Sequence, residues 1–292
     1  PDLSVVVLEK GSEVGAHILS GAVLDPVGLN KLIPDWKDKG APVTVAVNHD
    51  SFYMLGESGQ IRLPNWPMPK LMSNHGNYII SLGNLCRWLA GQAEELGVEI
   101  RLNTSATADL IASFRADHII LATGSTPRRL DLGDDTTVVD ATDALLHRDS
   151  LGKRIVIIGG GLTGCELALA MREAEAEVTI VEAEPDILTR NAPLCAANED
   201  MLRRLVPFHG IEVMANAKAL HTTPKGLMVE VNGHEKELPA DSVVAAIGYL
   251  PEQDLRGAVE ATGLPFNIIG DARKPANIMY AIWDAYEVTA KI

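Results

Sequence analysis

The sequence predicts an α/β fold built on mostly parallel sheets. Short runs rich in valine and isoleucine alternate with segments whose apolar residues recur at helical spacing, which indicates strands joined by crossover helices. The chain has 25 glycines and only 4% aromatic residues, a balance that suits tight strand-to-helix turns better than a sandwich core. At roughly 150 residues per domain, the 292 residues predict about two domains.

Composition and charge exclude several classes of function. The formal charge of −14 argues against a nucleic-acid partner, which needs a basic surface. The three cysteines have no CxxC spacing, and their odd number fits a reducing, cytoplasmic compartment. The uncharged stretch 71–86 is interrupted by polar residues, so it predicts no membrane span, and the N-terminus carries no signal peptide pattern. No metal site is expected, because metal-ligand spacing is absent from the histidines considered, His17, His75 and His209.

The first third of the chain predicts a strand, an irregular region and a helix. Residues 3–8 form a nearly continuous valine-rich run, typical of a buried parallel strand. Residues 11–80 are punctuated by proline and are expected to be irregular, except for a short helix near 27–33. A helix over 82–96 ends at Gly97, and a strand follows over 98–102.

The remainder alternates more regularly between strands and helices. We expect strands over residues 118–122, 154–158, 177–182, 211–215, 242–247 and 267–271, and helices over 162–174, 198–205 and 278–292. Val206-Pro207 should end the second of these helices. A hairpin over 227–238 should turn at Asn232-Gly233.

The most informative motif is a glycine-rich turn. Gly159, Gly161 and Gly164 match GxGxxG, directly after a strong strand and at the start of a helix. The first glycine allows the tight turn, the second lets a pyrophosphate approach the backbone, and the third permits close helix–strand packing. Glu182 ends the next strand, where a carboxylate accepts from a ribose 2′-OH and repels a 2′-phosphate, which favours NAD(H) over NADP(H). The alternative is a helix–strand turn that merely needs glycine.

Three further turns follow buried strands. They contain Thr123-Gly124, Gly248, and Gly270-Asp271, the last of which precedes the closing helix. Each alone would usually be an ordinary turn, but their order around the nucleotide loop makes them candidate cofactor-binding residues.

From about Leu96 onwards the chain resembles flavoprotein reductases that bind two dinucleotides. The closest likeness is to the FAD/NAD modules of the 2-enoate reductase and 2,4-dienoyl-CoA reductase group, and it is carried by the stretches 121–124, 156–166, 246–249 and 269–279. The resemblance implies two Rossmann-like domains, with an NAD domain over 148–244 inserted in a FAD-binding domain formed by 1–147 and 245–292.

The same resemblance implies roles for two carboxylates and one helix. Asp271 would hydrogen-bond the FAD ribityl chain, and the helix after it would point its positive end at the flavin pyrimidine edge. Glu166 would lie close to the nicotinamide; the alternative is an exposed helix glutamate.

Residues 2–97 resemble a different family, the electron-transfer flavoprotein–ubiquinone oxidoreductases. The stretches 7–22, 33–37, 74–79 and 82–89 carry this likeness, which implies that Glu9 binds the adenosine ribose of FAD. The two likenesses meet near residues 94–100. We interpret this junction as pointing to a recombined, engineered or reconstructed chain, with a natural divergent flavoprotein as the alternative.

The sequence departs from both families at its FAD domain. Both begin that domain with a strand and a GxGxxG loop, and the expected FAD domain here lacks them. The iron–sulfur cysteines of the quinone oxidoreductases and the barrel and cluster of the enoate reductases are also absent from the sequence. The electron acceptor is therefore unassigned. The apolar stretch 61–72 could contact a membrane or quinone, although an ordered surface loop is the preferred interpretation.

Three functions follow as hypotheses. The first is a FAD-dependent oxidoreductase module that passes hydride from NADH to FAD, with no protein acid–base residue assigned because the flavin performs the chemistry. The second is a membrane-associated carrier that delivers electrons to quinone. The third is a non-catalytic chimera or fold fragment.

Overall fold

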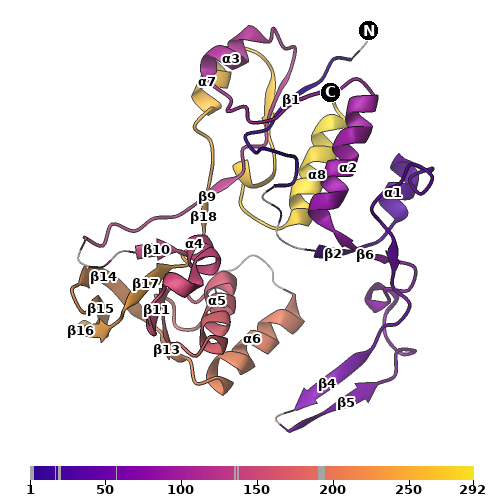
Figure 1. Ribbon diagram of the computed structural model, residues 1–292. Helices are drawn as coiled ribbons and strands as arrows, with labels where there is room; N and C mark the ends of the chain where they lie inside the picture. The colour runs from indigo at the N-terminus through magenta and orange to yellow at the C-terminus, as the bar shows by residue number, and fades with distance from the viewer. Residues whose placement is uncertain are drawn as a thin grey trace. The chain divides into compact units, whose positions relative to one another are not determined.

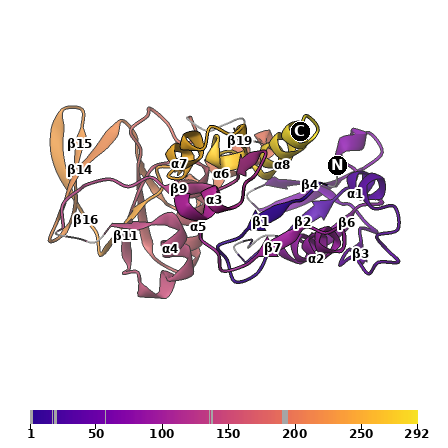
Figure 2. The same cartoon turned by 90° about the horizontal axis from the view of Figure 1, so that it is seen from above.

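The computed structural model describes residues 3–16, 18, 21–56, 58–134, 136, 138–189 and 195–292. The chain divides into two compact units, Pro1–Arg115 and Ala116–Ile292, each with its own strands, helices and core. Figures 1 and 2 show the elements of each unit from two directions.

The first unit contains a small antiparallel sheet with a helix attached. Its central strand β6 (Tyr78–Ser81) pairs with β2 (Gly21–Leu24) and β3 (Val45–Ala46). Helix α2 (Leu82–Glu95) begins directly after β6, where the Ser81 side chain accepts a hydrogen bond from the N–H of Asn84 and caps the helix. The core of this unit consists of Leu29, Trp36, Ala41, Val43, Ile80 and Leu85.

The other elements of this unit include the predicted first strand. Strand β1 (Val6–Leu8) pairs in parallel with β7 (Glu99–Arg101), which confirms both predicted strands, although each is shorter than expected. The expectation that the first strand is buried was wrong, since Val7 is 42% exposed. The remaining elements are α1 (Val27–Leu32), the hairpin of β4 (Phe52–Gly56) and β5 (Gly59–Leu63), η1 (Lys70–Met72) and α3 (Ala108–Ser113).

The prediction that residues 11–80 are irregular was wrong in part, because the described residues of this region form five strands. None is longer than five residues. Such short strands, separated by prolines, leave too few alternating positions for a period of two to stand out.

The second unit is centred on a five-stranded parallel sheet, which confirms the α/β prediction. The strand order is β10-β17-β11-β12-β13, and all of its pairs are parallel. The strands are β10 (Val138–Asp140), β11 (Arg154–Ile158), β12 (Glu177–Val181), β13 (Glu212–Met214) and β17 (Ser242–Ala245). Both faces of the sheet are buried, as expected for parallel strands.

Helices cover one face of this sheet and an antiparallel sheet covers the other. On one face Ile155 and Ile157 pack with residues of α4 (Ala141–Leu146), α5 (Leu162–Glu173) and α6 (Ala196–Phe208). On the other face Val156 and Ile158 pack against the three-stranded sheet of β14 (Ala217–Thr223), β15 (Gly226–Val231) and β16 (His234–Pro239). The β15–β16 turn contains Asn232 and Gly233, both with positive φ, which confirms the predicted hairpin.

Helix α6 corrects one expectation. Pro207 does not end the helix; it lies within the last turn, and the helix extends from Ala196 to Phe208. Val206 is completely buried in the same core as Leu202, and this packing holds the residue before the proline in helical conformation. The cost is limited because a proline in the last turn removes a single helical hydrogen bond.

The rest of the second unit consists of short pairs of strands and their helices. Strand β8 (Ile119–Leu121) pairs in parallel with β19 (Phe266–Ile268), and β9 (Ser125–Pro127) pairs antiparallel with β18 (Tyr249–Pro251). The other elements are η2 (Arg148–Ser150), α7 (Arg256–Ala261), η3 (Gly270–Ala272) and α8 (Ile278–Thr289).

Candidate functional site

The turn from β11 into α5 shows why its first and third glycines are needed. Gly159 has φ +105°, and a Cβ there would stand 2.5 Å from the Ala246 carbonyl oxygen. A Cβ on Gly164 would stand 1.9 Å from the Gly159 carbonyl oxygen, so helix and strand meet too closely for any side chain. The predicted roles in the tight turn and in close packing are confirmed for these two positions.

Gly161 occupies the N-cap of α5. Because glycine has no side chain, no side chain at this position covers the start of the helix. The partial positive charge at this end of the helix favours an anion. A phosphate at this turn stays a prediction, and the turn has the backbone shape that the prediction requires.

Glu182 follows β12 and is oriented by two backbone N–H groups. Its Oε2 accepts from the Gly160 N–H at 2.6 Å, and its Oε1 accepts from the Glu184 N–H at 2.8 Å. An ionised carboxylate has about four acceptor positions, so each oxygen can accept a further hydrogen bond. Glu182 therefore lies beside the glycine turn with its carboxylate oriented by the backbone, and its contact with a ribose stays a prediction.

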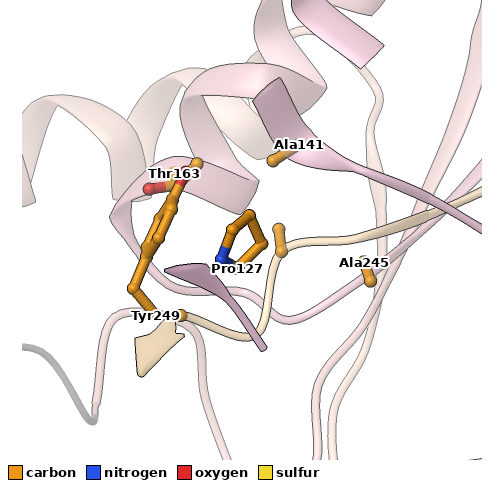
Figure 3. A pocket seen from close by; sticks show the side chains of 7 residues that line it. Pro127, Ala141, Thr163, Ala245 and Tyr249 are labelled. Atoms are coloured by element: carbon orange, nitrogen blue, oxygen red, sulfur yellow. The ribbon is translucent and has the colours of Figure 1, made fainter. Parts of the chain in front are cut away.

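A narrow pocket opens beside the N-terminus of α5 (Figure 3). Thr163, Gly248 and Tyr249 lie on it, and the Tyr249 ring stands next to Thr163. The Tyr249 hydroxyl is held 3.0 Å from Thr142 Oγ1. The full lining comprises Pro127, Ala141, Thr163, Ala245, Ala246, Gly248 and Tyr249. The structure thus brings the predicted Gly248 turn to the glycine turn of α5.

Glu166 lies one turn along α5 from Thr163, on the same side of the helix. The residue is at the surface, but partial burial of its carboxyl raises the pKa of Glu166. Its place near the pocket fits a role beside the nicotinamide, and its exposure fits an ordinary helix glutamate, so the role stays a prediction.

A second cluster forms around Asp271. Its Oδ2 accepts from the Ser125 hydroxyl at 3.3 Å, and its Oδ1 accepts from the Ala276 N–H at 3.0 Å. The neighbouring Gly270 has φ +59°, and its N–H donates to Asp284 Oδ2 at 3.0 Å. The structure therefore brings the turn after β8 and the turn after β19 together.

Thr123 and Gly124 shape the first of these turns. Gly124 has φ +80°, and its carbonyl oxygen accepts from the Glu252 N–H at 2.9 Å. The Thr123 hydroxyl donates to the Glu252 carbonyl oxygen at 2.5 Å. Both residues thus anchor the turn to the segment after β18, and they leave the adjacent Ser125 in contact with Asp271.

Glu9 lies in the first unit, and the other predicted site residues lie in the second. Its Oε1 accepts from the Gly11 N–H at 2.7 Å, which closes a short turn after β1. This is the position of a carboxylate at the end of a parallel strand, as predicted, but its link to a nucleotide stays a prediction.

Two contributors to the cluster around Asp271 were missed in the sequence. Asp284 accepts from the Gly270 N–H and also pairs with Arg273, and in the sequence it looks like an ordinary charge on an amphipathic helix. Ser125 was adjacent to a predicted turn but carried no signal of its own.

Among the residues that the structure describes, no group of three His, Cys, Asp or Glu side chains is arranged as metal ligands. No helix formed by them has the length and apolar character needed to cross a membrane.

Comparisons with known proteins confirm both resemblances, over different parts of the chain. The cinnamate reductase of Clostridium sporogenes is 47% identical over 208 residues, 71% of this chain and 31% of that protein. The mitochondrial electron transfer flavoprotein-ubiquinone oxidoreductase of Dictyostelium discoideum is 64% identical over 99 residues, 34% of this chain and 16% of that protein. The chain thus spans less than a third of either curated relative.

The fold has a counterpart among solved structures. A 2-naphthoyl-CoA reductase complex matches with a TM-score of 0.65 and 24% identity, over 99% of this chain and 36% of that one. This likeness supports the fold alone. The model of the pyridine nucleotide-disulphide oxidoreductases matches residues 108–272, more than half of the chain. The protein therefore belongs to the pyridine nucleotide-disulphide oxidoreductase family, flavoprotein oxidoreductases that typically bind FAD and NAD(P).

Proposed function

We propose that this chain is a module of a FAD-dependent oxidoreductase that passes hydride from NADH to FAD. The observation that carries the proposal is the β11–α5 turn, where a Cβ would clash at Gly159 and Gly164 and where Glu182 is already oriented. Such a turn accepts a pyrophosphate on the helix N-terminus and a ribose on the carboxylate. The final electron acceptor is not assigned.

Charge supports NADH rather than NADPH. Glu182 directly follows β12 and lies beside the glycine turn. A 2′-phosphate at the adenosine ribose would add about two negative charges beside Glu182, and the carboxylate would repel them. The 2′-hydroxyl of NADH can instead donate to it.

The cluster around Asp271 supports FAD. The flavin half would contact the turns that contain Thr123, Gly124, Gly248 and Gly270, with Asp271 at the ribityl chain. Helix α8 begins after this cluster, and its positive end favours negative charge on the flavin pyrimidine edge. When bound, the two cofactors supply the hydride-transfer chemistry, and the protein contributes positioning and electrostatics.

The test combines a spectrum with one pair of variants. The purified protein, supplied with FAD, should show a flavin absorbance band that bleaches when NADH is added without oxygen. Gly161→Leu should weaken NADH binding by about a hundredfold because the side chain obstructs the approach of the pyrophosphate. Gly257→Leu is the control, since the space around Gly257 is open. Undiminished NADH affinity in Gly161→Leu would refute the assignment.

An exposed hairpin favours a second candidate function, electron transfer to quinone at a membrane. Apolar side chains on β4 and β5 are unusually exposed, with Leu55 at 70% and Ile61 at 67%, and Trp66 follows at 87%. Contiguous exposed apolar surface marks sites of interaction with proteins or membranes. Cosedimentation with phospholipid vesicles, abolished by Leu55→Ser and Ile61→Ser together, would support this function. A protein that stays in the supernatant contradicts it.

The third candidate, a non-catalytic or recombined chain, predicts a different spectrum. FAD is added to the purified protein, and unbound FAD is then removed by gel filtration. A protein that remains colourless would favour this third candidate over both flavin-dependent functions.

A further inference from the structure

The segment from Glu182 to Thr189, here termed the acidic loop, forms hydrogen bonds with both the N–H and the carbonyl group of Gly160. Gly160 donates its N–H to Glu182 Oε2 at 2.6 Å and accepts from the Leu188 N–H at 2.8 Å. The Ile187 Cγ2 lies 2.7 Å from where a Cβ on Gly160 would stand. Both polar groups of Gly160 are therefore oriented by the acidic loop.

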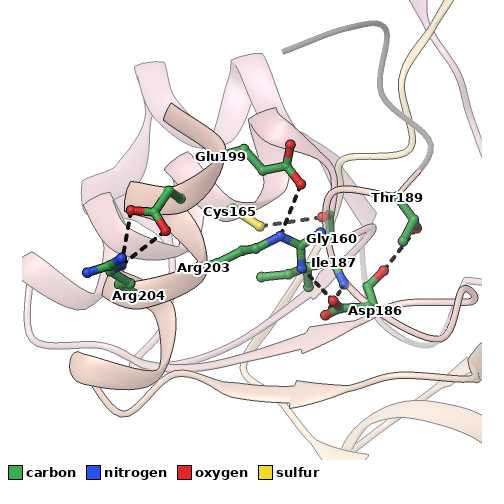
Figure 4. Close-up of polar contacts among 9 residues, drawn as sticks. Gly160, Cys165, Asp186, Ile187, Thr189, Glu199, Arg203 and Arg204 are labelled. Carbon is green, nitrogen blue, oxygen red and sulfur yellow. Dashed lines mark hydrogen bonds and ion pairs between the residues drawn. The ribbon is translucent and has the colours of Figure 1, made fainter. Parts of the chain in front are cut away.

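The acidic loop is itself fastened to α6 by Arg203 (Figure 4). Asp186 Oδ1 accepts from the Ile187 N–H at 2.8 Å, and its Oδ2 accepts from Arg203 Nη1 at 2.5 Å. Arg203 Nε also donates to Glu199 Oε1 at 3.1 Å, one turn earlier on the same helix. The Arg203 guanidinium thus binds the Asp186 carboxylate of the acidic loop, and the Glu199 carboxylate orients the guanidinium.

Burial and charge support this fastening. Ile187 and Leu188 are buried in the same core as Leu202, the residue before Arg203. The guanidinium carries the compensating positive charge between the carboxylates of Asp186 and Glu199. Without it, the two negative charges would repel each other across the junction of loop and helix.

We propose that Arg203 is a positioning residue for the dinucleotide: it holds the acidic loop so that Glu182 and Gly160 keep the geometry that receives the adenosine ribose. Arg203 acts through Asp186, and it is assigned no contact with the ligand. This inference rests on the proposed function, because it assumes that NADH binds at the glycine turn.

The experiment compares two neighbouring arginines on α6 by titration with NADH. Arg203→Met keeps the aliphatic stem but removes both ion pairs, and it should weaken NADH binding by about five- to tenfold. Arg204→Met is the matched control, since Arg204 pairs with Asp200 on the same helix and its side chain is 74% exposed. Both variants should melt within about 3 °C of the wild type, because exposed ion pairs contribute little to stability.

Two further variants separate positioning from general loosening of the fold. Arg203→Lys should restore part of the affinity, since an ammonium can reach one carboxylate but cannot form the forked contact with both. Asp186→Asn should weaken binding as Arg203→Met does, and the double variant should be no weaker than either single one. Affinity for ADP-ribose should fall by the same factor as affinity for NADH, because the loss concerns the adenosine half.

The outcomes distinguish the two levels of the argument. If the Arg203→Met variant binds NADH as tightly as the wild type, the positioning role is refuted and the proposed function is not affected. Equal losses in Arg203→Met and Arg204→Met also overturn it. A wild-type protein that does not bind NADH refutes both the inference and the proposed function.

Discussion

Replacing Gly164 by alanine is the sharpest test of the packing between α5 and β11. The new Cβ would stand 1.9 Å from the carbonyl oxygen of Gly159 and 3.1 Å from its carbonyl carbon. Both are backbone atoms of a turn in which the Gly159 N–H donates a hydrogen bond to the Val181 carbonyl oxygen. The clash therefore cannot be relieved by moving a flexible side chain. The helix must shift, and overpacking of this kind costs about 3 kcal/mol.

That cost should be visible in thermal unfolding followed by circular dichroism. For a unit of this size, about 3 kcal/mol lowers the melting temperature by about 6–12 °C. Gly257→Ala is the control in the same unit, because nothing lies within 4 Å of a Cβ at Gly257 and alanine favours the helix. It should raise stability by about 0.5–1 kcal/mol. A Gly164→Ala protein that melts at the wild-type temperature would refute the reasoning about close approach.

Three other predictions concern titratable and reactive groups. Partial burial raises the pKa of Glu166, so the charged form of this side chain destabilises the folded state. Glu166→Gln should therefore raise the melting temperature at pH 7. The gain should vanish near pH 3.5, below the unfolded pKa of about 4.3. An equal gain at both pH values would contradict this. Burial, and to a lesser extent the nearby Glu182 carboxylate, raises the pKa of Cys165 to about 12. At pH 8 iodoacetamide should therefore modify the exposed Cys195 and should modify Cys165 only after unfolding. Peptide mass spectrometry measures both modifications. Asp284→Asn should cost about 1–2 kcal/mol in denaturant unfolding because its contacts with Gly270 and Arg273 lose their charge; an unchanged midpoint would show that the contacts contribute nothing.

Elements with a local cause could be predicted from the sequence. The β11 strand, the glycine turn and the start of α5 follow from an apolar run, a backbone that only glycine tolerates, and helical spacing. The Asn232-Gly233 hairpin is equally local, since both residues have the positive φ that this turn requires. The strands β2, β3 and β6 were missed because their pairing depends on residues far apart in the chain, such as Val23 with Ile79. The hairpin of β4 and β5 is local, but its strands have only five residues each, too few for a period of two to stand out.

The candidate site divides in the same way. The sequence by itself determined the glycine positions and Glu182, because turn geometry and strand-end position place them within one β–α–β unit. Only the tertiary structure decided that Arg203 fastens the acidic loop, that Asp284 holds Gly270, and that Pro207 stays within a helix. These outcomes depend on which distant groups meet in the packed core, where burial of Leu202 and Val206 outweighs local preference.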